Sequence, residues 1–175
     1  MNRVDDFKKY LRLIVSKDDL LIYEYTPSLF RLVLVPMEPL NKVRKFRFLL
    51  EYIRGGYKIY YLAKDGIVVG YCVITPGGRR LKCSTTKDAV IGPYFITQEY
   101  RGQGLSKILI SQLVEYSIGK YEALYDWVYK NNLPSIHCME ACGFEVIGKL
   151  NVVGVFRRLI INTQGLYFVY RKACC

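Results

Sequence analysis

The chain has 175 residues, 51% of them hydrophobic, and a formal net charge of +11 at pH 7. This length and composition are typical of one globular domain and exclude a disordered chain. The positive charge favours an anionic partner, such as nucleic acid, a phosphorylated metabolite or an acidic substrate, without selecting among them.

The elements expected before the middle of the chain alternate between helices and strands. VDDFKKYLRLIV (4–15) has the pattern of an amphipathic helix, and two strands are expected at 20–25 and 29–35. Residues 37–56 have helical spacing that stops at two consecutive glycines. KIYYLAKDGIVVGYCVITPGG (58–78) contains two strands around Asp-Gly, which is a strong hairpin signal.

The second half of the chain continues this alternation without repeats or linkers. The expected order is strand, helix, strand, short helix and further strands, at 89–98, 105–120, 122–129, 132–143 and from Phe144 to Arg171. The whole pattern predicts a single α/β domain over residues 1–175, with a central mixed β-sheet flanked by helices.

The location and metal content follow from what the sequence lacks. No apolar run approaches the roughly 18 residues of a membrane span, and the acidic N-terminal stretch differs from a signal peptide. Six cysteines without CxxC spacing agree with a cytoplasmic protein. The side chains of His137, Cys138 and Cys142 lie on one predicted helix but do not point at one position, so we expect no metal. The lack of a membrane span leads us to expect no membrane partner.

The stretch ITQEYRGQGLSKIL (96–109) joins a predicted strand to a predicted helix through two glycines. A helix N-terminus has unpaired N–H groups and about half a positive charge, and small residues let a phosphate approach them. Neither a Walker A loop nor a dinucleotide fingerprint fits, because Lys107 stands where the latter needs its third glycine. An ordinary tight turn is the alternative interpretation.

Two segments resemble the GNAT acetyltransferase superfamily. RGQGLS (101–106) is similar to that family's acyl-CoA pyrophosphate loop, Gln/Arg-x-x-Gly-x-Gly/Ala. VYKNNLPSIHCMEACGF (128–144) resembles its strand–Asn–helix–Gly-Phe segment, with Asn132 and Ser135 at the expected spacings. The resemblance covers roughly residues 89–148 and implies a single-domain GNAT-like fold.

The resemblance also implies an activity, which is direct transfer of an acetyl or other acyl group from acetyl-CoA to an amine. The pyrophosphate is expected on the N–H groups after residue 101, and the pantetheine arm beside residues 95–97. An N–H near Ile96 is expected to stabilise the thioester oxyanion. The expected cofactor-binding residues are Phe95, Ile96, Thr97, Arg101, Gly102, Gln103, Gly104, Leu105, Ser106 and Asn132. Asn132 has an alternative role as a helix N-cap.

Two positions depart from the family pattern. Ser106 stands where Gly or Ala is usual, which still leaves room for a phosphate. Met139 stands where family members commonly have a tyrosine that protonates the departing thiolate. Methionine cannot donate a proton and commonly fills a core, so the general acid is left open.

We expect Asp126 to be the catalytic general base, since an amine nucleophile must lose a proton. Strand alternation places Asp126 between Leu124 and Val128 on one face, where an unpaired carboxylate is costly. Pairing with a cation is the alternative. Glu24 and Glu99 are weaker candidates.

Two other classes of function stay open. Met139 keeps open a non-catalytic acyl-CoA-binding module, and the charge alone supports a basic nucleic-acid-binding protein, which ranks lower. The charge and the sixteen tyrosines favour a small or sugar-linked acceptor that is anionic or nucleotide-linked. We expect a monomer or a homodimer.

Overall fold

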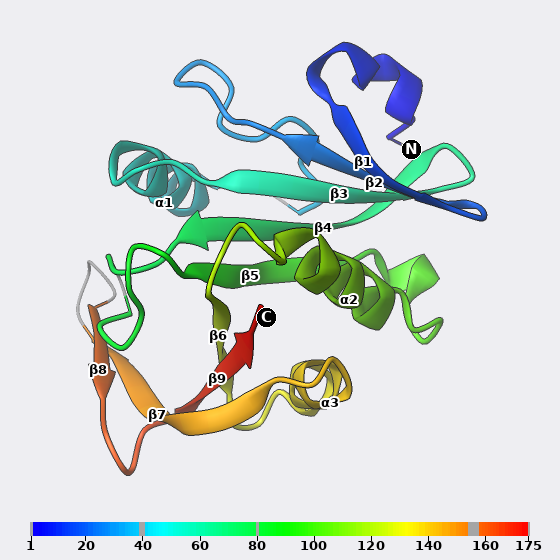
Figure 1. The fold of residues 1–175 in the computed structure, drawn as a ribbon. Coiled ribbons are helices and arrows are strands. Elements are labelled where there is room, and N and C mark those ends of the chain that lie inside the picture. Colours follow the sequence, from blue (N-terminus) through cyan, green and yellow to red (C-terminus); the bar gives the residue numbers. More distant parts are fainter. Residues whose placement is uncertain (1, 39–40, 80, 154–157, 175) are drawn as a thin grey trace. The chain divides into compact units, whose positions relative to one another are not determined.

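The computed structural model describes residues 2–38, 41–79, 81–153 and 158–174. The chain groups into two compact units: the first unit comprises Met1–Thr75 and Gly92–Gln112, and the second unit comprises Pro76–Ile91 and Leu113–Cys175. The described strands form one mixed sheet in the order β1-β2-β3-β4-β5-β6-β9-β7-β8, which confirms the α/β class (Figure 1). The expectation of a single domain stays a prediction.

The elements that begin in the first unit are β1 (Arg12–Lys17), β2 (Leu20–Tyr25), α1 (Lys42–Ile53), β3 (Lys58–Lys64), β4 (Ile67–Pro76) and α2 (Leu105–Ser117). Those that begin in the second unit are β5 (Ala89–Ile96), β6 (Ala123–Tyr129), α3 (Leu133–Ala141), β7 (Glu145–Val153), β8 (Arg158–Ile161) and β9 (Tyr167–Ala173). Most expected elements are therefore present, with ends shifted by a few residues.

Strands β1 to β4 of the first unit are antiparallel neighbours. The β3–β4 hairpin turns at Asp65 and Gly66, which have φ angles of 49° and 74°. Positive φ at both turn residues matches the right-handed twist of the strands and explains the Asp-Gly pair. Helix α1 packs Phe48 and Tyr52 against the buried cluster on one face of these strands.

The helix predicted over residues 4–15 is wrong. The chain instead makes two short 3-10 turns, Val4–Asp6 and Lys8–Tyr10, and then enters β1. Strand β1 pairs with β2, with Leu13 opposite Tyr23. Pairing with a neighbouring strand supplies backbone hydrogen bonds that outweigh the helical spacing of the apolar residues.

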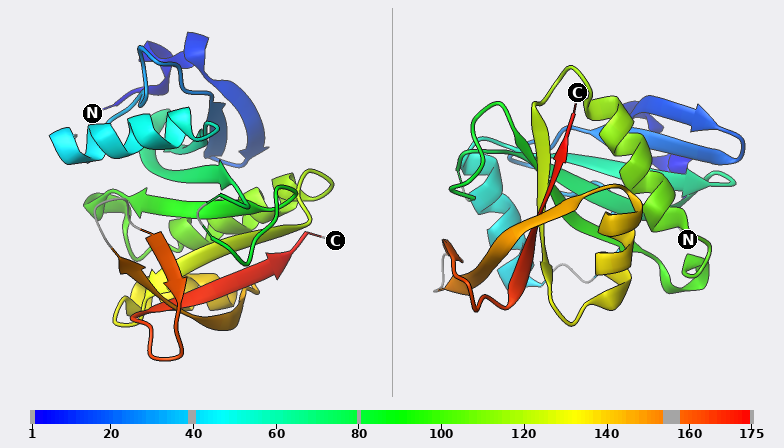
Figure 2. Two further views of the ribbon diagram at one scale, coloured as in Figure 1. Left: turned by 90° about the vertical axis from the view of Figure 1, so that its left-hand side faces the viewer. Right: turned by 60° about the horizontal axis from the view of Figure 1, so that its bottom comes forward.

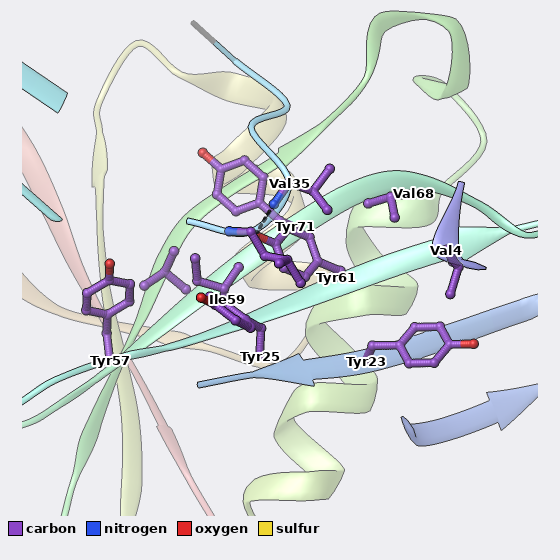
Figure 3. Close-up of a cluster of buried hydrophobic side chains, with 12 residues drawn as sticks. Val4, Tyr23, Tyr25, Val35, Tyr57, Ile59, Tyr61, Val68 and Tyr71 are labelled. Atoms are coloured by element: carbon purple, nitrogen blue, oxygen red, sulfur yellow. Dashed lines mark hydrogen bonds between the residues drawn. The ribbon is translucent and has the colours of Figure 1, made fainter. Parts of the chain in front are cut away.

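The strand predicted over residues 29–35 is also wrong. Hydroxyls of tyrosines in or next to the sheet bind backbone groups of this segment instead, and Figure 3 shows the contact of Tyr61. Tyr25 donates to the carbonyl oxygen of Arg31, and Tyr57 donates to that of Leu32 at 2.6 Å. The Tyr61 hydroxyl oxygen accepts from the amides of residues 34 and 35 at 3.2 and 3.1 Å. The segment is thereby fixed without joining the sheet.

Replacing Tyr61 by Phe is expected to lower the free energy of unfolding by about 1–3 kcal/mol, because two buried amides lose their acceptor. Thermal melting measures this loss. Tyr23→Phe is the matched control: Tyr23 belongs to the same cluster, and its hydroxyl has no hydrogen-bond partner among the described residues. Equal melting temperatures for the two variants would contradict the anchoring role of Tyr61.

The second unit is built around β6 (Figure 2). Strand β6 runs parallel to the first residues of β5, with Ala89 opposite Leu124, and antiparallel to β9 along its whole length. Strand β9 pairs in turn with β7, and β7 pairs with β8. Among the described residues of the chain, no helix has both the length and the apolar character needed to cross a membrane.

Candidate functional site

The glycine loop, residues 101–106, connects β5 to α2 in the first unit. Strand β5 ends at Ile96, a 3-10 turn follows, and α2 begins at Leu105. Gly102 and Gly104 have φ angles of 78° and 72°. Residues with a Cβ rarely adopt this left-handed conformation, so the backbone itself requires glycine at both positions.

The glycine loop is open toward one side. A Cβ added to Gly102 or Gly104 would meet no atom within 4 Å. Within the described part of the chain, no acceptor binds the backbone N–H groups of residues 102–106, and the first bond of α2 runs from Ile108 to Gly104 at 3.1 Å. Free amides at the start of a 13-residue helix fit a phosphate.

Two basic side chains, one in the glycine loop and one next to it, are held in place by hydrogen bonds. The Nε of Arg101 donates to the carbonyl oxygen of Ile96 at 3.0 Å, and its guanidinium lies 5.2 Å from the ring centre of Phe95. Lys64, at the end of β3, donates to the side-chain oxygen of Gln103 at 3.3 Å. Lys64 also forms an ion pair with Asp19 at 3.7 Å, so the charge of Arg101 is the main one that favours an anion at the loop. The sequence did not indicate Lys64, because β3 is remote from the loop along the chain.

The end of β5 is held tightly against β4. The amide and the hydroxyl of Thr97 both donate to the carbonyl oxygen of Val69, at 2.9 and 3.2 Å, so Thr97 offers neither donor to a bound ligand. A Cβ on Gly70 would lie 2.5 Å from Cδ1 of Ile96 and 2.8 Å from the carbonyl oxygen of Phe95. Glycine inside a strand is the sequence signal for such a close approach, and Gly70 was missed.

Asp126 lies on β6 in the second unit and is 7% exposed. Its Oδ1 accepts a hydrogen bond from the amide of Trp127 at 2.7 Å. Burial raises the pKa of Asp126 to about 7, against the smaller opposing effect of that bond. No cation within ion-pair distance is found for Asp126 among the described residues, so the expected alternative of a salt bridge is not observed.

The other residues named from the second segment have structural positions in α3. The side chain of Asn132 accepts from the amide of Ser135 at 3.4 Å, which confirms the N-cap role. A contact between Asn132 and the cofactor stays a prediction. Met139 is fully buried, as expected for a core residue, while His137 is exposed.

Met139→Leu is expected to retain most of the activity, since the methionine side chain only packs and leucine has a similar volume. Steady-state kinetics of acetyl transfer at several pH values checks this. A large fall in turnover without loss of folding would show that Met139 contributes more than packing.

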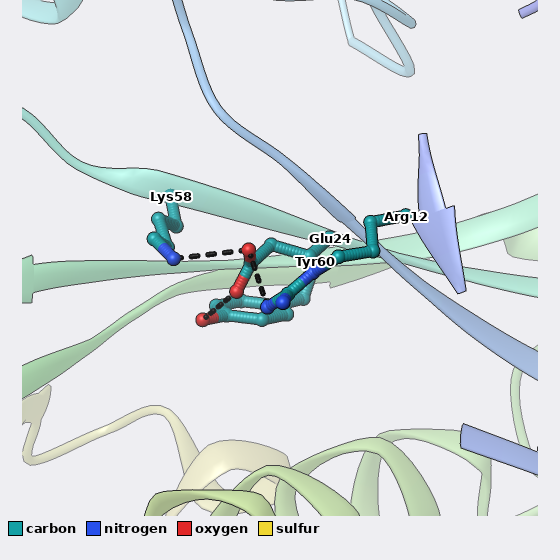
Figure 4. Close-up of polar contacts among 4 residues, drawn as sticks. All are labelled: Arg12, Glu24, Lys58 and Tyr60. Carbon is teal, nitrogen blue, oxygen red and sulfur yellow. Dashed lines mark hydrogen bonds and ion pairs between the residues drawn. The ribbon is translucent and has the colours of Figure 1, made fainter. Parts of the chain in front are cut away.

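Glu24 is the buried centre of a polar cluster on β1–β3 (Figure 4). It accepts from Lys58 at 2.9 Å, Arg12 at 2.8 Å and the Tyr60 hydroxyl at 3.0 Å. Burial alone would raise the pKa of Glu24, but the hydrogen bond and charge of Lys58, with Tyr60 and Arg12, hold it below its usual value. These partners indicate a structural carboxylate rather than a base.

Glu24→Gln is expected to destabilise the protein by roughly 1–3 kcal/mol at neutral pH, because charge-assisted hydrogen bonds are lost. A carboxylate with a lowered folded pKa stabilises the fold above its unfolded pKa, and this contribution disappears as the pH falls through the folded pKa. The difference between parent and variant in denaturant melts should therefore vanish in acid. Glu99→Gln, at an exposed glutamate, is the control; a Glu24 effect that persists unchanged in acid would exclude the ionic explanation.

Potential metal ligands do not cluster in the described part of the chain, where no three His, Cys, Asp or Glu side chains lie close enough to hold an ion. Cys72, Cys138 and Cys174 are buried free thiols, and Cys83 and Cys142 are half-buried free thiols. Cys175 lies outside the described residues.

A small pocket with a volume of about 20 Å³ opens to solvent in the first unit. At its polar end, Glu38 accepts from the Tyr71 hydroxyl at 2.6 Å and from Arg44 at 2.8 Å. The other lining residues are apolar or aromatic: Val33, Val35, Pro36, Met37, Phe48, Ile59 and Tyr61. No sequence pattern indicated this pocket, because Glu38 and Tyr71 are 33 residues apart.

Comparison with known proteins gives a family and a fold. The model of the family described as "Acetyltransferase (GNAT) family" matches residues 23–144. No curated protein matches the sequence. Similar solved structures include a GNAT family acetyltransferase from Elizabethkingia anophelis with acetyl-CoA bound. The two sequences are 11% identical, the match covers 90% of this chain and 99% of that chain, and the TM-score is 0.62.

Two further solved structures have the same fold. An acetyltransferase from Thermus thermophilus is 18% identical over 78% of this chain and 76% of that chain, with a TM-score of 0.57. A ribosomal-protein-alanine N-acetyltransferase from Brucella melitensis is 22% identical over 74% of this chain and 76% of that chain, with a TM-score of 0.52. At these identities the likeness shows the fold.

Proposed function

Because the chain belongs to the GNAT acetyltransferase family, we propose that it is an N-acetyltransferase that moves the acetyl group of acetyl-CoA to a primary amine of a small or sugar-linked acceptor. The observation that carries this proposal is the glycine loop at the start of α2, with its open side and its free amides. The Elizabethkingia anophelis structure, which has the same fold, holds acetyl-CoA.

The residues of the first unit suit the parts of acetyl-CoA that the family binds. The amides of residues 102–106 would hold the pyrophosphate, and Arg101 and Lys64 would add positive charge beside it. The end of β5 at Phe95 and Ile96 would lie along the pantetheine arm. Thr97 supports this strand rather than the ligand, since Val69 accepts from both of its donors.

The proposed transfer is a direct attack. The amine nitrogen forms a bond to the acetyl carbonyl carbon, and the bond between that carbon and sulfur breaks. The sulfur leaves as a thiolate and takes up a proton, while the nitrogen gives one to a base. A thiol titrates near pH 8.5, so the thiolate leaves without a dedicated acid, and Met139 in the usual tyrosine position argues only against high turnover.

We propose Asp126 as the general base because of the chemistry of this group. A carboxyl with a pKa of about 7 changes its protonation near the working pH, which is the property that general base catalysis requires. Strongly raised pKa values cluster at functional sites but also occur at structural ones, and the kinetics of an Asp126→Asn variant separate the two.

The remaining parts of the proposal concern partners and location. We propose a cytoplasmic monomer or homodimer, as expected from the sequence. A binding module without catalysis would use the same glycine loop. This alternative is supported by Met139, which stands where the family commonly has a proton-donating tyrosine. Nucleic-acid binding rests on the +11 charge alone.

Thermal melting with acetyl-CoA, CoA and a DNA or RNA oligomer tests the proposal. A ligand present at about 100 times its Kd adds roughly 2.7 kcal/mol to stability. We expect both acetyl-CoA and CoA to raise the melting temperature and the oligomers to leave it unchanged. No shift at millimolar acetyl-CoA would remove the proposed function, and a shift with the oligomer alone would support the nucleic-acid alternative.

A further inference from the structure

We infer that the outer side of α1 docks the protein onto a negatively charged lipid bilayer, with the helix lying flat in the headgroup layer. The inference goes beyond the proposed acetyl transfer and does not depend on it. It rests on three features of the first unit: an apolar stripe on the outside of α1, the basic side chains beside that stripe, and a second apolar projection between β2 and α1.

Helix α1 has one apolar side toward the core and another toward solvent. Phe48 and Tyr52 pack against the buried cluster of the first unit. The opposite side carries four apolar residues at spacings of three, four and three, which places them in one line along the helix. This outer stripe consists of Val43, Phe46, Leu50 and Ile53.

The outer stripe is exposed to solvent. Val43, Phe46 and Ile53 are 68%, 52% and 69% exposed, and the left view of Figure 2 shows α1 along the outside of the first unit. A surface helix normally places polar residues on its outer side, and a helix that is apolar all round is normally covered. An exposed apolar stripe with a polar border therefore indicates an interaction surface.

The border of the outer stripe is basic. Helix α1 contains four basic residues and one acidic residue, and the latter lies 3.8 Å from the arginine that follows the helix. Arg44 pairs with Glu38 at 2.8 Å. Neither Lys42 nor Lys45 has an ion-pair partner in the described part of the chain, and both are exposed. These charges favour an anionic partner.

A tight turn between β2 and α1 presents two more apolar side chains. The amide of Ser28 donates to the carbonyl oxygen of Arg31 at 3.2 Å, and the amide of Arg31 donates to the carbonyl oxygen of Ser28 at 3.0 Å. Leu29 and Phe30 at the tip are 55% and 99% exposed. The guanidinium of Arg31 lies 4.1 Å from the ring centre of Tyr10, which is also exposed. An apolar tip beside a cation and a tyrosine is typical of a membrane interface.

The turn and α1 belong to one preformed surface. The hydroxyl of Tyr25 donates to a carbonyl oxygen at the base of the turn. The segment after the turn reaches α1, since Val33 and Val35 line the small pocket together with Arg44 and Phe48. Little ordering is then required when the tip and the outer stripe bind one extended surface.

An anionic bilayer matches these features better than other partners do. A second copy would bring its own lysines against Lys42 and Lys45, and each chain has a net charge of +11. Nucleic acid would leave the outer stripe unburied, and a protein would need a hole shaped for Phe30. An interfacial helix buries its apolar side at the acyl boundary while its Lys and Arg side chains reach the headgroups.

The length of α1 suits a helix on a membrane rather than one across it. Its 12 residues extend about 18 Å, which is shorter than the hydrocarbon core of roughly 30 Å. The lack of a membrane-spanning run in the sequence therefore has no bearing on this surface.

Vesicle sedimentation of the full chain tests the inference. Vesicles of phosphatidylcholine alone are compared with vesicles of phosphatidylcholine and phosphatidylglycerol in a ratio of about two to one, at low and high ionic strength. We expect binding to the mixed vesicles only, and weaker binding at high ionic strength, because salt screens the attraction between basic side chains and anionic headgroups.

Two variants of α1 should weaken this binding. Phe46→Ser should weaken it about five- to tenfold, because a large apolar side chain no longer enters the bilayer. The double variant Lys42→Gln and Lys45→Gln should weaken it about ten- to thirtyfold at low ionic strength and reduce the salt dependence. Circular dichroism separates loss of binding from loss of folding.

Two control variants carry the same changes in the second unit. Ile160→Ser removes an apolar side chain that is 50% exposed, and Lys87→Gln with Lys130→Gln removes two exposed positive charges. Both controls should bind the mixed vesicles as the parent does. No binding of the parent, or equal losses in the controls and the α1 variants, would overturn the inference.

Two further results would assign the surface to another partner and overturn the inference. One is a dimer that Phe46→Ser dissociates, and the other is binding of the parent to an acidic helical peptide but not to vesicles. Acetyl-CoA binding, measured separately by calorimetry, should be the same in the parent and in every variant. Failure of the vesicle experiment therefore leaves the proposed function unaffected.

Discussion

Gly104→Val is expected to abolish acetyl-CoA binding while the protein stays folded. Gly104 has a φ of 72°, and its missing Cβ faces open space at the start of α2. A branched side chain would fill the space proposed for the pyrophosphate and disfavour the turn. Loss of one or two charge-assisted hydrogen bonds corresponds to an increase in Kd of about a hundredfold or more. Calorimetric titration with acetyl-CoA measures it.

Gly119→Val supplies the control for backbone strain. Gly119 follows α2, is exposed, has a φ of 74° and also has no atom within 4 Å of an added Cβ. Both variants should lose about 1–2 kcal/mol of stability from the left-handed conformation, but only the change at Gly104 should affect binding. A folded Gly104→Val protein with normal affinity for CoA would show that the phosphate site lies elsewhere.

Asp126→Asn is expected to lower kcat/KM by about 10²–10⁴-fold, the usual contribution of a general base. In the parent, kcat/KM should rise with pH up to about 7, as Asp126 loses its proton. The variant should lack this acidic limb. Initial rates of CoA release between about pH 5 and pH 9 measure both effects. Equal activity of parent and variant at every pH would make Asp126 structural and leave the proton to another base or to water.

Asp126→Asn is also expected to change how the free energy of unfolding depends on pH. Burial raises the folded pKa of Asp126 above its unfolded value, so ionisation costs the folded state more than the unfolded state. The parent should therefore lose stability as the pH rises from about 4 through 7, by on the order of 1.4 kcal/mol per unit of pKa difference. Asp126→Asn should flatten this dependence. Parallel melting curves for both proteins across that pH range would contradict the buried, raised-pKa carboxyl.

The parts of the fold that the sequence predicted correctly have local causes. The hairpin at Asp65-Gly66 follows from the φ angles that those two residues tolerate. Helix α3 begins directly after its cap Asn132, and Gly143, with a φ of 75°, follows its C-cap Cys142. The turn at Gly102 and Gly104 could be predicted for a similar reason, because glycine tolerates the positive φ angles found there.

The two wrong elements depend on partners that are remote in sequence. Residues 12–17 form a strand because β2 is available to pair with them. Residues 29–35 stay outside the sheet because hydroxyls of Tyr25, Tyr57 and Tyr61 bind their backbone groups. A periodicity analysis counts tyrosine as an apolar residue and cannot foresee that its hydroxyl replaces a strand partner.

The candidate site likewise contains features that the sequence predicts and features that only the fold reveals. The loop could be predicted, whereas Gly70, Lys64 and the Glu38–Tyr71 pair could not, since each acquires its role only from a neighbour that the fold brings to it. Asp126 was recognised as an unusual carboxyl from strand alternation, and its burial confirms that part of the prediction. Its catalytic role stays a prediction.

The most direct test of acetyl transfer is to measure acetylated amine and free CoA in one reaction of the parent protein with acetyl-CoA and a panel of primary amines. We predict that both products accumulate together in equal amounts, and that neither forms with Gly104→Val. Tight acetyl-CoA binding with no acetylated amine from any member of the panel would contradict acetyl transfer and identify a binding module instead.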